Sequence, residues 1–120
     1  MPQAKVVMNI RKVTDKTSII DIQGEVTGFA ENVLMDAYAE ASNSQTSAII
    51  LNFSELEYMN SSGIGLLVTL LIRVQRQKQR LLACGLSDHY QEIFELTRLD
   101  DAIATYATEA KALATLNGSK

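Results

Sequence analysis

Two adjacent serines stand where a loop turns into a helix, in the order Asn60, Ser61, Ser62, Gly63. The first N–H groups of a helix have no partner within the helix, and the helix dipole favours negative charge there. One interpretation is a helix cap built from Asn-Ser-Ser, followed by small residues that let the helix approach a sheet. The other is a serine that accepts a phosphate, which adds roughly −1.5 to −2 charges. The residue types alone leave both interpretations open.

The helix that follows is apolar where a surface helix normally carries charge. At about 100° per residue, one side gathers Ile64, Leu67, Val68, Leu71, Val74 and Gln75, which we take as the core face. The opposite side presents Ser62, Leu66, Thr69 and Arg73, with Leu70 at its flank. An exposed apolar strip beside a modifiable serine predicts a protein-binding surface made by Leu66, Thr69, Leu70 and Arg73. The alternative is that a neighbouring helix covers the two leucines.

The hydrophobic pattern predicts the elements that position this segment. The predicted strands are 5–13, 18–23, 48–53, 81–84 and 103–106, the last at a sheet edge. The predicted helices are 29–41, 62–79, 88–97 and 108–116. The first helix is predicted from Phe29, Val33, Ala37 and Ala41, which repeat every four residues.

This order of elements predicts one α/β domain over residues 1–120. A short polar turn joins the first two strands as a hairpin. Apolar strands that alternate with helices indicate parallel crossovers, so the sheet should be mixed and packed against about four helices. We expect residues 115–120 to fray.

The composition argues against several classes of function. With 11 basic and 14 acidic residues, a net charge of −3 gives no electrostatic footprint for binding nucleic acid. One cysteine and one histidine argue against a disulfide framework and a zinc site, so we expect no metal and no cofactor. No apolar stretch approaches the length of a membrane span, and no signal-peptide core follows Met1. We therefore expect a cytoplasmic protein without membrane insertion.

The sequence contains no complete enzyme motif. The Gly-Ile-Gly at 63–65 lacks the third glycine of a dinucleotide-binding loop and the Lys-Ser/Thr of a P-loop. Ser62 and His89 could be combined into a triad on paper, but Asn60 and Ile64 occupy the glycine positions of a nucleophile elbow. We expect no catalytic residues, and we expect His89 to be exposed in the first turn of its helix.

The segment 60–67, Asn-Ser-Ser-Gly-Ile-Gly-Leu-Leu, resembles the Asp-Ser-Ser-Gly-Leu-Gly signature of STAS domains. It is especially similar to that of the small bacterial anti-sigma factor antagonists. Gly-Glu-Val-Thr at 24–27 stands where that family usually has Gly-Glu-Leu-Asp. The opening hairpin, the strand at 48–53 and the glycine after 81–84 also fit, so the resemblance covers nearly the whole chain.

The resemblance implies a phosphoprotein that regulates transcription in a bacterial stress response by partner switching. In that family the unmodified antagonist binds an anti-sigma factor that is also a serine kinase, and this frees a sigma factor. The kinase phosphorylates the second serine of the signature, which matches Ser62, and a PP2C-type phosphatase restores the antagonist. The alternative is a STAS scaffold, stressosome-like or transporter-associated, without direct control of a sigma factor.

The predicted neighbours of the phosphate are Asn60, Ser61, Gly63 and Thr27, with Ser61 as a local capping residue. Asn60 and Thr27 replace two residues that are usually acidic in the family. The loss of two carboxylates would reduce the repulsion of a phosphate. Equally, it would fit a divergent member with other partners.

Overall fold

The structure is a computed structural model that describes residues 5–117. Its strands are β1 (Val6–Lys12), β2 (Thr17–Val26), β3 (Ala48–Met59), β4 (Arg80–Cys84) and β5 (Ala104–Tyr106). Its helices are α1 (Glu31–Ala41), α2 (Ser61–Arg76), α3 (Asp88–Leu96) and α4 (Glu109–Asn117). Two 3-10 turns, η1 (Gly28–Ala30) and η2 (Leu99–Asp101), complete the described elements.

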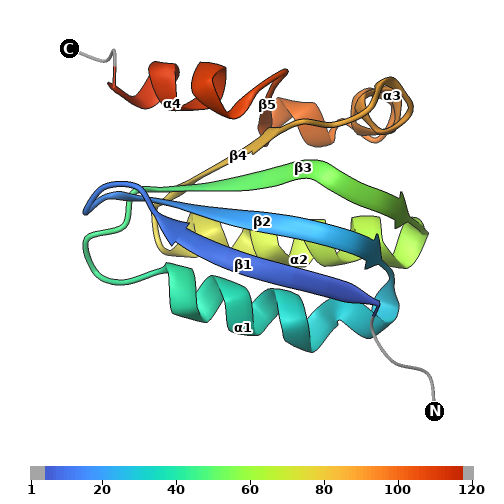
Figure 1. Cartoon of the computed structure of the whole chain (residues 1–120), viewed down its shortest axis with the longest axis horizontal. Helices are drawn as coiled ribbons and strands as arrows, with labels where there is room; N and C mark the ends of the chain where they lie inside the picture. The colour runs from blue at the N-terminus through green and yellow to red at the C-terminus, as the bar shows by residue number, and fades with distance from the viewer. Residues whose placement is uncertain (1–4, 118–120) are drawn as a thin grey trace.

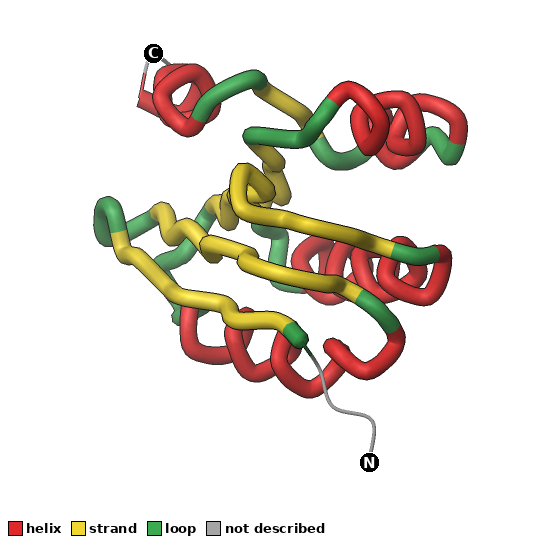
Figure 2. The backbone as a smooth tube through the Cα atoms, turned by 45° about the vertical axis from the view of Figure 1, so that its right-hand side comes forward, coloured by secondary structure: helices red, strands yellow, loops and turns green. Residues whose placement is uncertain are grey.

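The five strands form one mixed sheet in the order β1-β2-β3-β4-β5 (Figure 1). β1 and β2 pair antiparallel, and every later pair is parallel. The predicted α/β class, hairpin, parallel crossovers and edge strand are therefore confirmed. In Figures 1 and 2, α1 and α2 lie on one side of the sheet and α4 lies on the other. Phe94 of α3 belongs to the same buried cluster as residues of α1 and α2, so α3 packs on their face, while Ala112 of α4 belongs to the cluster of the opposite face.

The alternation of side chains along β2 and β3 supplies a core to each face of the sheet. Ile20 and Leu51 belong to the larger buried cluster, together with residues of α1 and α2. Ile19 and Ile50 point into a smaller cluster, which also holds Cys84 and Ala112 of α4. These strands are covered on both faces, which explains their nearly continuous apolar sequences.

β3 is longer than predicted, because it ends at Met59 and not at residue 53. Its second half pairs with the extended end of β2, up to the partners Val26 and Met59. Two register shifts interrupt this pairing, between Asp21 and Gln23 and between Gly24 and Glu25. The shifts break the strict alternation of side chains, so periodicity does not reveal this part of the strand.

Two predictions about helix ends are wrong. The α-helix predicted over 29–41 starts at Glu31, because the 3-10 turn η1 occupies residues 28–30. The helix predicted to reach residue 79 ends at Arg76, because Lys78 adopts a left-handed conformation with φ 59°. Of the tail that was expected to fray, residues 115–117 are assigned to α4, and 118–120 lie outside the described residues.

Candidate functional site

The serine pair lies at the junction of β3 and α2, beside the end of β2. Asn60 caps α2: its side-chain oxygen Oδ1 accepts a hydrogen bond from the N–H of Gly63 at 2.9 Å. Its carbonyl accepts from the N–H of Ile64 at 3.0 Å, and its own N–H donates to the Val26 carbonyl at 3.3 Å. The predicted cap is therefore present, but Asn60 provides it, and the capping role expected of Ser61 is wrong.

Ser61 and Ser62 occupy the exposed first turn of α2. Asn60 satisfies the N–H groups of Gly63 and Ile64. The N–H groups of Ser61 and Ser62 have no acceptor within the helix, because they precede its first full turn. A negative group on either serine would lie at the positive end of the helix dipole.

Gly63 holds α2 against the end of β2. A Cβ at this position would come within 2.1 Å of the Val26 carbonyl oxygen, a backbone atom that cannot move aside cheaply. The approach of the helix to the sheet, predicted from the small residues, therefore depends on this glycine.

η1 lies directly beside Ser62. A Cβ built on Gly28 would meet the Cβ of Ser62 at 3.4 Å. Thr27 caps η1, since its Oγ1 accepts from the N–H of Phe29 at 3.3 Å. The predicted neighbours Thr27, Asn60, Ser61 and Gly63 are thus gathered at one end of the sheet.

The two departures from the family signature retain a structural role in this geometry. The side chains of Asn60 and Thr27 each accept a backbone hydrogen bond that an aspartate could also accept. The substitutions keep both caps and remove two negative charges from the end of the sheet where Ser62 lies.

Leu66 and Leu70 are buried, so their predicted exposure is wrong. Leu66 is 9% exposed and Leu70 0%, and both belong to the larger core with Leu34 and Tyr38 of α1. Leu66 and Leu70 therefore do not form the exposed apolar strip that was the reason for placing them in the predicted interface. Thr69 and Arg73, the other two residues predicted there, are exposed.

The error arises because α2 is apolar around most of its circumference. Val68 was assigned to the core face by periodicity, yet it is 40% exposed. The contact of Gly63 with Val26 sets the rotation, and from Gly63 the buried side continues through Leu67, Leu70 and Val74. The need for a glycine at 63 was the signal in the sequence that could have oriented the helix.

Exposed apolar side chains do follow the serines along α2, but they are not the two predicted leucines. They are Val68 and Ile72, 40% and 46% exposed, beside Thr69 and Arg73. Phe29 on η1 directly follows Gly28, the neighbour of Ser62, and it is 62% exposed. We call Phe29, Val68, Thr69, Ile72 and Arg73 the α2 surface.

Arg73 is held in place at the far end of this surface. Its guanidinium lies 5.7 Å from the centre of the Tyr38 ring, a cation–π contact. Tyr38 in turn donates its hydroxyl proton to Gln79 Oε1 at 2.7 Å. Arg73 therefore presents its charge from a fixed position between α1 and α2.

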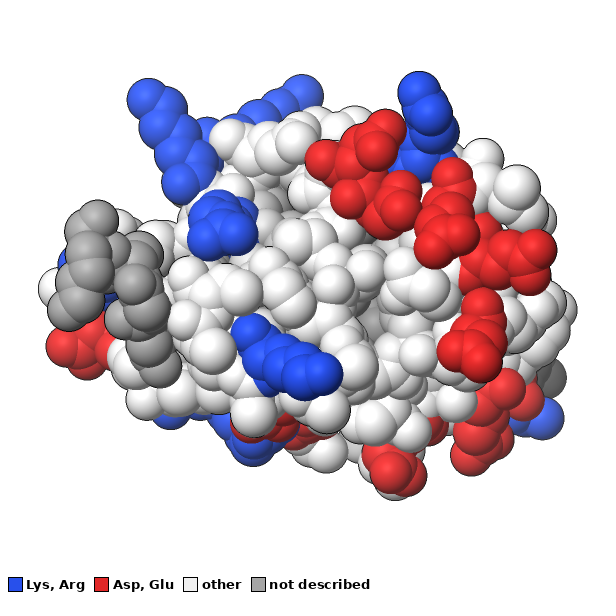
Figure 3. Space-filling model, turned by 90° about the horizontal axis from the view of Figure 1, so that it is seen from above, with Lys and Arg blue, Asp and Glu red and all other residues white. Residues whose placement is uncertain are grey.

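Charge is distributed unequally between the two ends of the molecule. Figure 3 shows Asp and Glu gathered toward the end where α3 lies, and Lys and Arg mostly toward the other. The exposed acidic residues of α3 are Asp88, Glu92 and Glu95, and those in the second half of β3 are Glu55 and Glu57. Because Ser62 follows β3, a phosphate there would add to the acidic end.

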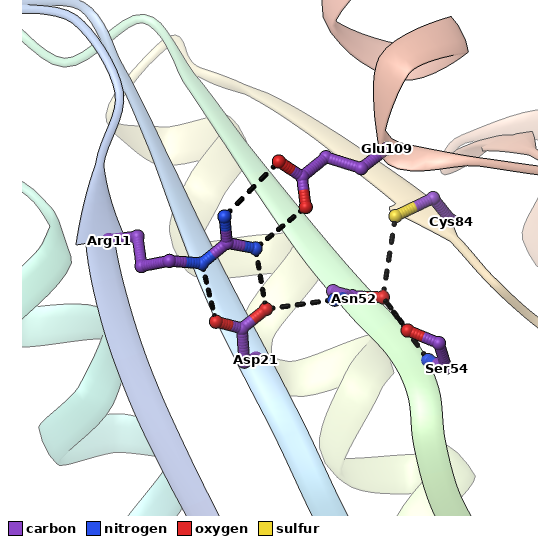
Figure 4. Close-up of polar contacts among 6 residues, drawn as sticks. All are labelled: Arg11, Asp21, Asn52, Ser54, Cys84 and Glu109. Atoms are coloured by element: carbon purple, nitrogen blue, oxygen red, sulfur yellow. Dashed lines mark hydrogen bonds and ion pairs between the residues drawn. The ribbon is translucent and has the colours of Figure 1, made fainter.

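A polar network that sequence reasoning missed joins the sheet to α4 (Figure 4). Arg11 donates to both carboxylate oxygens of Asp21, at 2.6 and 2.7 Å, and to both of Glu109, at 2.7 and 3.1 Å. Asn52 also donates to Asp21, at 2.8 Å. The hydrogen bond from Arg11 is the main reason why the pKa of Asp21 lies below its ordinary value. No local motif marks these residues, because they come from separate strands and a distant helix.

The remaining residues considered for chemistry do not form a centre. Cys84 is buried, and desolvation raises its pKa to about 11, so the thiol stays protonated at neutral pH. His89 is exposed, as predicted. Within residues 5–117 no three His, Cys, Asp or Glu side chains group as metal ligands. Over the same residues, no helix has the length and apolarity of a membrane span.

Comparison with known proteins supports one family. An anti-sigma-B factor antagonist of Staphylococcus aureus (strain NCTC 8325 / PS 47) is 30% identical over 95 residues, which cover 78% of this chain and 88% of that protein. An anti-sigma factor antagonist from Mycobacterium paratuberculosis has a similar structure, with a TM-score of 0.79, 18% identity and coverage of 97% and 99% of the two chains.

The phosphorylated form of SpoIIAA, a cell fate determinant of Bacillus, has the same fold. It matches with a TM-score of 0.71 at 24% identity, over 92% of this chain and 99% of the other. The STAS domain model itself matches residues 9–112, which include most of the sheet and the serine pair. This chain therefore belongs to the STAS domain family.

Proposed function

We propose that this protein is an anti-sigma factor antagonist that acts by partner switching, with Ser62 as the phosphate acceptor. Its unmodified form binds an anti-sigma factor that is also a serine kinase, and so frees a sigma factor. Phosphorylation of Ser62 ends that binding, and a PP2C-type phosphatase reverses it. The relatives named as anti-sigma-B factor antagonists support the general role.

The choice of Ser62 rests on one observation: at the start of α2, Asn60 caps the helix and the Ser62 hydroxyl is exposed. Asn60 supplies the cap, so the exposed hydroxyl of Ser62 is not needed to hold the helix. Because residue 28 is a glycine, it places no side chain in the space next to the Cβ of Ser62. A phosphate on Ser62 can therefore form without disturbing the fold.

The α2 surface is the proposed contact with the kinase. Switching a partner from 99:1 bound to 1:99 requires about 5.5 kcal/mol of differential binding. A surface ion pair supplies roughly 0–1 kcal/mol, which is too little. A nearly dianionic phosphate on Ser62 would have to be desolvated when a partner covers the start of α2 together with the α2 surface, and that cost is large.

The acceptor is tested by incubating the protein with the kinase of its own cells and ATP, followed by mass spectrometry. We expect one phosphate, on Ser62, and none on Ser62→Ala. Ser61→Ala is the matched control, since it removes the adjacent exposed hydroxyl and should be phosphorylated normally. Phosphorylation of Ser62→Ala at an undiminished rate would show that the acceptor is another residue.

The switch is tested by calorimetric titration of the same kinase with four forms of the protein. The unmodified form and Ser62→Ala should bind equally, and the phosphorylated form should bind about 10⁴-fold more weakly, which corresponds to the 5.5 kcal/mol above. Ser62→Asp should fall between them, because it carries one charge and less bulk. If the phosphorylated form binds as tightly as the unmodified form, the switch is wrong.

That last result would favour a STAS scaffold without direct control of a sigma factor. The observation in its favour is the replacement of two usually acidic residues by Asn60 and Thr27, which changes the charge that a partner meets at this site. Unchanged affinity after phosphorylation is what a scaffold predicts.

A further inference from the structure

A pocket lies at the end of the sheet opposite the serine pair, where three connecting segments come together. They are the β1–β2 turn, the segment before β3 and the turn from α2 into β4. The pocket has a volume of about 400 Å³, in the range of small-molecule sites. Its polar lining comes from Thr14, Lys16, Thr17, Ser47, Lys78 and Arg80. We call it the basic pocket.

Backbone hydrogen bonds hold the three connections in fixed register. The Lys16 carbonyl accepts from the N–H of Ser47 at 2.8 Å, and the Ser47 carbonyl accepts from the N–H of Arg80 at 2.8 Å. Thr14 Oγ1 accepts from the N–H of Lys16 at 3.1 Å, which fixes the β1–β2 turn. The backbone that carries the three cationic side chains is therefore ordered before any ligand arrives, which lowers the entropic cost of binding.

The three cations of the basic pocket form no ion pair among the described residues. Among residues 5–117 the ion pairs join Arg11 to Asp21 and Glu109, and Arg98 to Asp101, so Lys16, Lys78 and Arg80 take part in none. Arg80 also lines a neighbouring pocket, whose lining includes Asp100 and Asp101. Three positive charges around one pocket raise the local potential, although the net charge of the chain is −3. The nearby Asp15 lines the adjacent pocket with Lys12, and does not line this one.

We propose that the basic pocket binds the diphosphate group of a small phosphorylated molecule. The planar guanidinium of Arg80 can donate two parallel hydrogen bonds to a phosphate, and each lysine supplies a compact charge. Two linked phosphates carry enough charge to match three cations within one pocket. The hydroxyl groups of Thr14 and Ser47 add neutral donors beside them. This site is separate from the proposed switch, because it lies at the other end of the sheet.

The test is a titration of the uniformly ¹⁵N-labelled protein with sodium diphosphate at constant ionic strength, followed by NMR. We expect saturable shifts at the amides of Lys16, Ser47 and Arg80. Arg80→Gln and Lys16→Gln should each raise the Kd by about tenfold, the loss of one charge-assisted hydrogen bond. Lys5→Gln is the matched control: it removes the same charge near the other end of the sheet and should leave the Kd unchanged.

A second arm of the titration uses ADP to distinguish the sources of the group. Tighter binding of ADP than of diphosphate identifies a nucleotide, and equal or weaker binding identifies a free polyphosphate. The proposal is overturned if diphosphate produces no saturable shifts, or if Lys5→Gln weakens binding as much as Arg80→Gln. It is also overturned if a glutamate-rich peptide shifts the pocket amides and diphosphate does not.

Discussion

At the scale of single residues, Asn60 and Gly63 have different structural roles at the N-terminus of α2. Asn60 satisfies the N–H of Gly63, and Gly63 allows the helix to touch the Val26 carbonyl. A side chain at 63 would remove that contact without altering the exposed serines. The two glycines of the signature, Gly63 and Gly65, therefore have separate roles.

We predict that Gly63→Ala lowers the free energy of unfolding by about 3 kcal/mol, because its Cβ would meet a backbone oxygen at 2.1 Å. Gly65→Ala is the control. A Cβ there meets nothing within 4 Å, and alanine should raise stability by roughly 0.5–1 kcal/mol in a helix. Urea unfolding followed by circular dichroism measures both. Equal stability of the two variants would contradict the close approach of α2 to β2.

At the scale of elements, the rotation of α2 separates a core face from a binding face. Leu70 is fully buried beneath α1, while Ile72 is 46% exposed only two positions away. A substitution by alanine should therefore lower stability at Leu70 and weaken binding at Ile72.

We predict that Leu70→Ala destabilises the fold by about 2–5 kcal/mol, because it leaves a cavity in the core. Ile72→Ala should change stability by no more than about 0.5 kcal/mol, yet weaken binding of the proposed kinase partner. Urea unfolding and calorimetric titration of both variants decide this. If Ile72→Ala binds as well as the unmodified protein, Ile72 does not belong to the interface.

At the scale of the whole molecule, Arg11 connects parts that the chain order keeps far apart. Its guanidinium bridges Asp21 on β2 and Glu109 at the start of α4. The network is partly exposed to solvent, so each pair contributes modestly to stability. The network connects the start of α4 to β1 and β2.

The lowered pKa of Asp21 predicts how this network responds to acid. Its stabilisation is complete above the unfolded pKa, about 3.9, and is lost as the pH falls through the lower folded pKa. Asp21→Asn should therefore be less stable than the unmodified protein by about 1 kcal/mol at pH 7, and the difference should shrink below about pH 4. Urea unfolding of both proteins at pH 7 and at a pH below about 4 measures this difference.

Asp15→Asn is the control for that experiment. It makes the same change of charge in the β1–β2 turn, and Asp15 forms no ion pair among the described residues. Its stability should follow that of the unmodified protein at both pH values. A constant difference between Asp21→Asn and the unmodified protein would contradict the role of the Asp21 charge.

Much of the fold could be predicted because local patterns encode it directly. Alternating and continuous apolar runs identified the hairpin, the two buried central strands and the parallel order of the sheet. One of the two interpretations of the residue types was a cap and a close helix–sheet approach at 60–63, and the structure shows both. Side-chain direction has a period of two in strands and near 3.6 in helices, so short segments carry this information.

Other features depend on contacts between segments that are distant in sequence. α2 is apolar on almost every side, so its own sequence allowed two rotations, and the contact with Val26 selected the one that buries Leu66 and Leu70. The second half of β3 exists because β2 extends beside it with shifted register. The Arg11 network and the basic pocket join residues from separate elements, and only the packing of those elements brings the side chains together.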